Sequence, residues 1–331
     1  MAICFQEYIV KIKWKHVYII VIVACNNKIH ILFLKGSAPS LWRGKGFPPK
    51  LDLTVVTEYK DLFSSLTSEI TNVVPFINII LVGEAAAGKS SLVNTFATAL
   101  DGGKTIKTIC NSGPLSYGPG SLTSTNHIEA LHIGENMLHV RLHDLPGIAH
   151  TTIVREDELN MVIDGKIKPN AKIQTALEMA QNKDILRENP KPADKMHCII
   201  YVIRATFNTA LDCHQSDSLK VLRNIRNKRK AEDDAIQFAI VTAIDEIGVN
   251  NYDMENAYNY PCIRPICDYV SRVLMLDPNR VIPVSNYFEE MSPTDAKNAM
   301  SLFALWKVCS AGQDYIKRNW GEKTIRADFH Q

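Results

Sequence analysis

Residues 83–90 read GEAAAGKS, a segment bounded by two glycines and followed by a lysine and a serine. The spacing matches the pattern GxxxxGK followed by Ser or Thr, in which backbone N–H groups curl around a phosphate. Lys89 is expected to reach the terminal phosphates, and Ser90 to place its hydroxyl on Mg²⁺. The positive end of a following helix would face the anion. The predicted phosphate-binding residues are Gly83, Glu84, Ala85, Ala86, Ala87, Gly88, Lys89, Ser90 and Ser91.

A second polar segment, DLPG at 144–147, follows an apolar run. An acidic residue at the carboxyl end of such a strand holds Mg²⁺ through water, and Gly147 allows a backbone N–H to approach the terminal phosphate. We therefore assign catalytic roles to Lys89, Asp144 and Gly147.

The long loop 101–125 contains two threonines that are candidates for the same Mg²⁺ ion. In switch proteins a threonine hydroxyl from this region joins the ion when the terminal phosphate is present. Thr123 and Thr125 both fit, and the alternative is an ordinary polar loop. The predicted metal ligands are Ser90, Thr123 and Asp144, with Thr125 as the substitute for Thr123.

A third polar segment, TAID at 242–245, follows the apolar run 236–241. Guanine-specific proteins place Asn or Thr, then Lys, any residue and Asp here, and the Asp accepts two hydrogen bonds from the base. Thr242 and Asp245 fit, whereas Ala243 stands in place of the lysine that lies against the base. Ser285 ends a further apolar run, where a backbone amide can meet the guanine oxygen. The alternative for Asp245 is a helix cap after a strand.

Apolar, largely β-branched runs predict the strands that position these segments. We expect strands at 77–82, 127–133, 137–143, 196–203, 236–241 and 280–285. Between them we expect helices at 91–100, 155–163, 171–181 and 215–230, and a last helix capped by Ser292. The alternation predicts an α/β fold, a three-layer P-loop NTPase of the G-domain type, with a mostly parallel sheet and helices on both faces.

The charge balance and the cysteines of the chain limit which ligands and compartments are expected. The chain has 331 residues with 37 Lys and Arg against 35 Asp and Glu, a net charge of +2 that predicts no nucleic-acid binding. Its eight cysteines show no metal-ligand spacing, so we expect free thiols in a reducing cytoplasm, without a structural metal or disulfides.

Residues 1–50 differ from the rest and are predicted to be an extension and linker. Two apolar runs, 17–25 and 28–34, flank Asn26 and Asn27, which favours a β-hairpin or a loosely attached extension. A secretion signal or membrane anchor is the second interpretation, although each run is too short to span a bilayer. We expect the phosphate-binding domain to cover residues 51–320 and a tail to cover 321–331.

In combination, these segments resemble the interferon-induced protein 44 family of GTP-binding proteins over about residues 70–320. The segments that carry the resemblance are INIILVGEAAAGKSSLVNTF at 77–96, DLPGI at 144–148, MHCIIYVI at 196–203, VTAIDE at 241–246 and VIPVSNYFEE at 281–290. The chain departs from the family at Ala243, where members tend to carry Lys, and its first 50 residues are too few for the additional domain of larger relatives.

The resemblance implies GTP or GDP with Mg²⁺ as ligands, and a role in innate immune or antiviral responses. Many switch GTPases place a glutamine where Ile148 follows Gly147, so we expect slow hydrolysis unless a protein partner or a homodimer supplies a group. The alternatives are a non-catalytic interaction protein with a degenerate base site and, third, an ATPase.

Overall fold

The computed structural model describes residues 18–25, 28–35, 50–68, 70–110, 128–133, 139–148, 156–172, 175–206, 217–231 and 235–321. The chain divides into two compact units, Met1–Arg43 and Gly44–Gln331. In the first unit, β1 (Tyr18–Cys25) pairs antiparallel with β2 (Lys28–Lys35) in the register of a hairpin.

The second unit is built on a six-stranded sheet with the order β4-β5-β3-β6-β7-β8. The strands are β3 (Ile77–Gly83), β4 (Glu129–His132), β5 (Val140–Asp144), β6 (Cys198–Arg204), β7 (Ile236–Thr242) and β8 (Val281–Pro283). All neighbouring pairs are parallel except β4 and β5. The predicted mostly parallel sheet of an α/β fold is therefore confirmed. Because every residue of β3 is buried, its apolar run matches a strand covered on both faces.

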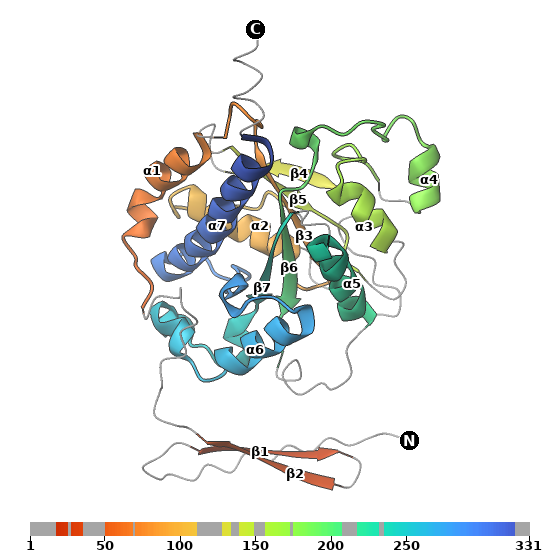
Figure 1. The fold of residues 1–331 in the computed structure, drawn as a ribbon. Helices are drawn as coiled ribbons and strands as arrows, with labels where there is room; N and C mark the ends of the chain where they lie inside the picture. The colour runs from red at the N-terminus through yellow and green to blue at the C-terminus, as the bar shows by residue number, and fades with distance from the viewer. Residues whose placement is uncertain are drawn as a thin grey trace. The chain divides into compact units, whose positions relative to one another are not determined.

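Helices pack on the two sides of this sheet (Figure 1). The helices α1 (Val55–Ser68), α2 (Lys89–Leu100) and α7 (Asp295–Ile316) contact one another. The helix α5 (Asp217–Ala231) contacts both α3 (Glu156–Ile163) and α6 (Ile263–Leu274). The short helix α4 (Ala176–Gln181) packs on α3. Within the described residues, no helix combines the length and apolar character that crossing a membrane requires.

Two predicted helix starts are wrong. The last helix is capped by Thr294, whose hydroxyl accepts a hydrogen bond from Lys297 N at 3.4 Å, and Ser292 lies outside it. Thr294 is the cap because its own N–H donates to Tyr287 Oη, 3.0 Å away, and this bond holds its backbone in the extended conformation that a cap requires. The predicted helix 171–181 begins only at Ala176, since the backbone at 170–171 hydrogen-bonds to residue 128 instead.

Candidate functional site

The segment 83–90 forms a tight turn between β3 and α2, and both of its glycines are required by their surroundings. A Cβ at Gly83 would collide with the carbonyl oxygen of Val202 on β6. Gly88 has a φ of 87°, a left-handed conformation that favours glycine, and a Cβ there would lie 2.9 Å from Asn286 Nδ2. No side chain among the described residues caps α2, so its first N–H groups remain available to an anion.

Lys89 folds back over this turn. Its Nζ donates to the carbonyl oxygens of Gly83 at 3.2 Å and Glu84 at 2.9 Å. The side chain is only 6% exposed, and burial lowers the pKa of Lys89 to about 8, while the nearby Asp144 and Glu84 oppose that shift. At neutral pH the ammonium is therefore still mostly protonated, and it lies among backbone carbonyls at the mouth of the loop.

Ser90 and Asp144 meet beside the loop. Ser90 Oγ donates to Asp144 Oδ2 over 2.6 Å, although the two residues are 54 positions apart in the sequence. Asp144 is fully buried at the carboxyl end of β5, and its Oδ1 has no hydrogen-bond partner among the described residues. Burial raises the pKa of Asp144, while the hydrogen bond from Ser90 and the charge of Lys89 act in the opposite direction. A buried carboxylate with an unused oxygen beside a serine hydroxyl is a suitable donor set for Mg²⁺.

The residue directly after the segment 144–147 is hydrogen-bonded to the phosphate loop. Ile148 N donates to Gly83 O at 3.0 Å, and Ala85 N donates to Ile148 O at the same distance. A Cβ at Gly147 would lie 2.6 Å from Ala85 N and closer still to its Cα. Gly147 therefore permits a backbone approach that no other residue allows.

The end of β7 and the loop after β8 hold the phosphate loop from the other side. Thr242 Oγ1 donates to Ala87 O at 2.6 Å, and Asn286 Nδ2 donates to Gly88 O at 3.1 Å. Both bonds are accepted by backbone carbonyl oxygens of the phosphate loop, so they do not use its N–H groups. As a result, the segment that carries Asp245 lies against the segment that carries Lys89, at the carboxyl edge of the sheet.

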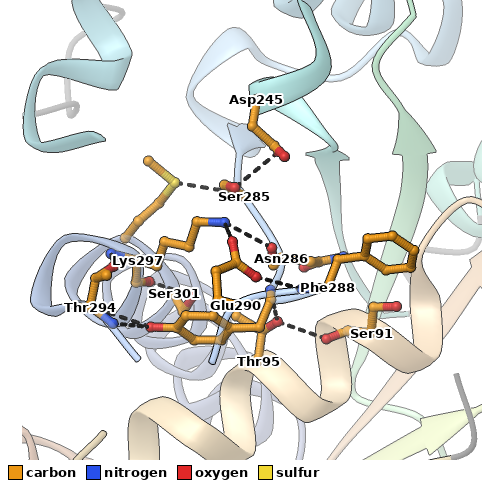
Figure 2. A network of polar contacts seen from close by, with 12 residues as sticks. Ser91, Thr95, Asp245, Ser285, Asn286, Phe288, Glu290, Thr294, Lys297 and Ser301 are labelled. Atoms are coloured by element: carbon orange, nitrogen blue, oxygen red, sulfur yellow. Dashed lines mark hydrogen bonds and ion pairs between the residues drawn. The ribbon is translucent and has the colours of Figure 1, made fainter. Parts of the chain in front are cut away.

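Asp245 is oriented by Ser285, whose Oγ donates to Asp245 Oδ1 over 3.0 Å (Figure 2). Ser285 N donates instead to Met300 Sδ at 3.3 Å, so the backbone amide of Ser285 is already engaged and its hydroxyl makes the contact with the site. Ala243 adopts a left-handed conformation with φ 57° and is buried.

A partly buried polar network fixes the loop that carries Ser285. Lys297 of α7 forms an ion pair with Glu290 and donates to Asn286 O at 3.1 Å (Figure 2). Tyr287 N donates to Thr95 Oγ1 of α2 at 3.0 Å. The loop is thereby attached to both helices that lie under the site.

The structure brings together the predicted residues of the phosphate loop, Asp144, Gly147, Thr242, Asp245 and Ser285. Thr123 and Thr125 lie outside the described residues, so their predicted metal contact stays a prediction.

Sequence reasoning missed several residues at this edge. Arg204, at the carboxyl end of β6, lies 3.5 Å from Ala86 O through Nη1 and pairs with Glu246. Its place at the end of a central parallel strand was the available signal. The side chains of Asn286 and Lys297 act through contacts across the fold that no local pattern indicates.

Comparisons with known proteins give a weak sequence similarity. No family model matches the chain. It is 21% identical over 264 residues to interferon-induced protein 44 from Pan troglodytes and from Homo sapiens, which covers 78% of this chain. The chain spans 58% of the length of each of these curated relatives.

Solved structures that match this chain include Toc33 from Arabidopsis thaliana. A dimerization-deficient mutant of Toc33 is 12% identical, with a TM-score of 0.43 over 80% of this chain and 93% of that one. Toc33 in complex with GDP and Mg²⁺ is 10% identical, with a TM-score of 0.40 over 81% and 98%. The strand order and the loop between β3 and α2 show an α/β fold of the P-loop NTPase type, and the chain is weakly similar in sequence to interferon-induced protein 44.

Proposed function

We propose that this chain binds GTP and GDP with Mg²⁺ and hydrolyses GTP slowly. The observation that carries the proposal is the pair of hydrogen bonds from Thr242 and Asn286 to the carbonyl groups of the phosphate loop. Thr242 precedes Asp245 by three residues, and its bond to the loop that contains Lys89 supports a site in which one ligand presents phosphates to the loop and a base to the carboxylate.

The residues at the phosphate end fit such a ligand. The uncapped N–H groups of α2 and the ammonium of Lys89 would bind the β- and γ-phosphates. Ser90 would hold Mg²⁺ directly, Asp144 would act through water, and Thr123 or Thr125 is the proposed further ligand. When bound, Mg²⁺ neutralises charge on the phosphate oxygens. The unpartnered Oδ1 of Asp144 supports this assignment, because a buried carboxylate oxygen requires a partner.

At the base end, Ser285 holds one oxygen of Asp245, and the carboxylate would accept the guanine N–H groups. Ala243 cannot cover the base as a lysine would. We therefore expect guanine selectivity to persist, because it depends on the carboxylate, while affinity is reduced.

Slow hydrolysis follows from the residue after Gly147. Ile148 is buried, its backbone is bonded to the phosphate loop, and its apolar side chain cannot orient an attacking water. A second copy of the chain or another protein would then have to supply a polar group. Single-turnover hydrolysis by the monomer at the rate of a fully activated GTPase would refute this part of the proposal.

The resemblance to interferon-induced protein 44 supports a proposed role in innate immune or antiviral responses. Among the described residues, five cysteines are free thiols. Free thiols are typical of reducing compartments, which supports a proposed cytoplasmic location.

The proposal is tested by thermal unfolding of the purified chain with GTP and Mg²⁺. A ligand present at 100 times its dissociation constant adds about 2.7 kcal/mol to the free energy of unfolding. Lys89→Ala should abolish the GTP-dependent shift, while Lys104→Ala, an exposed lysine past α2, should retain it. No shift at millimolar GTP in the unmodified chain would contradict the proposal.

A second candidate is a non-catalytic interaction protein whose base site binds nucleotide weakly. Ala243 and Ile148 favour it, because each replaces a polar side chain that active GTPases use. An ATPase is a third candidate, which predicts that ATP competes as well as GTP and that Asp245→Asn has no effect.

A further inference from the structure

A thiol and two carboxylates gather beside Ser90. Cys110 Sγ and one carboxylate oxygen each of Glu129 and Asp144 lie within 4.8 Å of one another. Cys110 and Asp144 are buried, whereas Glu129 is partly exposed. In a tetrahedral zinc site, bond lengths of about 2.3 Å to sulfur and 2.0 Å to oxygen put the ligand atoms about 3.5 Å apart. Side-chain movements of about 1 Å would close this cluster around an ion.

The strand pairing places the two carboxylates against each other. Glu129 on β4 stands directly opposite Asp144 on β5 in the antiparallel register, so both side chains project from the same face. Like charges in that position are destabilising. Ser90 engages Oδ2 of Asp144, and Oδ1 is the buried oxygen without a hydrogen-bond partner among the described residues. A cation bound between the carboxylates would offset their repulsion and give Asp144 Oδ1 a partner.

Cys110 is held in place by α2. Asn94 Oδ1 accepts from Ile109 N at 2.9 Å and from Cys110 N at 2.8 Å, and Asn94 Nδ2 donates to Cys110 O at 3.0 Å. Three hydrogen bonds from one buried side chain thus set the position of the cysteine backbone. Outer contacts of this kind orient the ligands in protein metal sites.

We propose that Cys110, Glu129 and Asp144 bind a thiophilic divalent cation of the zinc class, with water as the fourth ligand. The sulfur ligand selects Zn²⁺ over Mg²⁺, which prefers oxygen ligands. This ion is distinct from the Mg²⁺ of the nucleotide, although the two would share Asp144. Three protein ligands and an open position also leave the ion accessible to small molecules.

The test is titration of the full metal-free chain with Co²⁺ under reducing conditions and without nucleotide. We expect one equivalent to produce a thiolate-to-cobalt charge-transfer band, which Zn²⁺ then abolishes. Cys110→Ser should remove the band. Glu129→Gln should keep the band but weaken Co²⁺ binding at least tenfold. Cys262→Ser, at a partly exposed cysteine before α6, is the matched control and should behave like the unmodified chain.

Thermal melting of each variant shows that it is folded, and Glu129→Gln tests the site without touching the cysteine. Absence of the band in the unmodified chain, its persistence in Cys110→Ser, or unchanged Co²⁺ affinity in Glu129→Gln would overturn the proposal. Because nucleotide is absent, a chain that binds Co²⁺ through Cys110 but never binds GTP would refute only the proposed function.

Discussion

Replacing Gly147 with alanine should separate two loops that the structure holds together. The new Cβ would lie 2.6 Å from Ala85 N, whereas ordinary contacts begin near 3.4 Å. The obstacle is backbone rather than a flexible side chain, so the loops must move apart by about 1 Å. That movement strains or breaks the two hydrogen bonds between Ile148 and the phosphate loop.

The cost can be estimated from these contacts. Overpacking costs about 1–3 kcal/mol, and each lost hydrogen bond adds about 1 kcal/mol, which gives roughly 3–5 kcal/mol in total. For a unit of about 290 residues, each kcal/mol shifts the Tm by about 2 °C, so we expect Tm to fall by roughly 6–10 °C.

The assay is thermal unfolding without nucleotide, compared with Gly102→Ala. Gly102 has a φ of 77° and no atom within 4 Å of a Cβ, so alanine there causes only backbone strain of about 1 kcal/mol. If Gly147→Ala is no less stable than Gly102→Ala, the close approach at Gly147 does not constrain the site and the reasoning fails.

Three further predictions follow from named contacts. Burial lowers the pKa of His197 to about 4, and its Nδ1 accepts from Asn78 N, so the folded state binds fewer protons than the unfolded state between pH 4 and 6.5. Stability should therefore fall as pH falls through that window, by about 3 kcal/mol in all. Urea unfolding should show a shallower pH dependence in His197→Gln, and equal slopes would contradict the assignment. Asp245→Asn should weaken GTP binding roughly 100-fold in a competition assay and leave ATP binding unchanged, because an amide opposes guanine donors; parallel losses for both nucleotides would argue against base recognition. If the proposed function holds, one equivalent of Zn²⁺ should weaken Mg²⁺-dependent GTP binding in the unmodified chain but not in Cys110→Ser, as measured by calorimetry, and an equal effect on both would show that Asp144 is not shared.

The sequence was sufficient where a local pattern determines the structure. The apolar runs before Gly83, Asp144 and Thr242 predicted buried strands, because only a covered parallel sheet accommodates such runs. These three strands are parallel, so their carboxyl ends lie at the same edge of the sheet. The sequence-based prediction of the site required this arrangement.

Other features depend on contacts between distant segments and left no local signal. Ser292 followed by proline resembles a helix start, yet the tertiary hydrogen bond to Tyr287 moves the cap to Thr294. The backbone N–H of Ser285 likewise donates to the sulfur of Met300 in α7, 15 residues away, a contact that no local pattern predicts. Asn94 reads as one more polar residue in an amphipathic helix, but the fold uses it to hold Cys110.

The hydrogen bond from Asn286 to Gly88 O joins the loop after β8 to the phosphate loop, and under the proposed function it would couple recognition of the two ends of a nucleotide. The segment that carries Asp245 and the phosphate loop are already aligned. A ligand that binds one of them therefore meets the other at a high effective concentration, which raises its overall affinity. Guanosine and pyrophosphate added separately should each bind far more weakly than the joined molecule. Losing the hydrogen bonds of both Asn286 and Thr242 to the phosphate loop would convert one bivalent site into two weak ones.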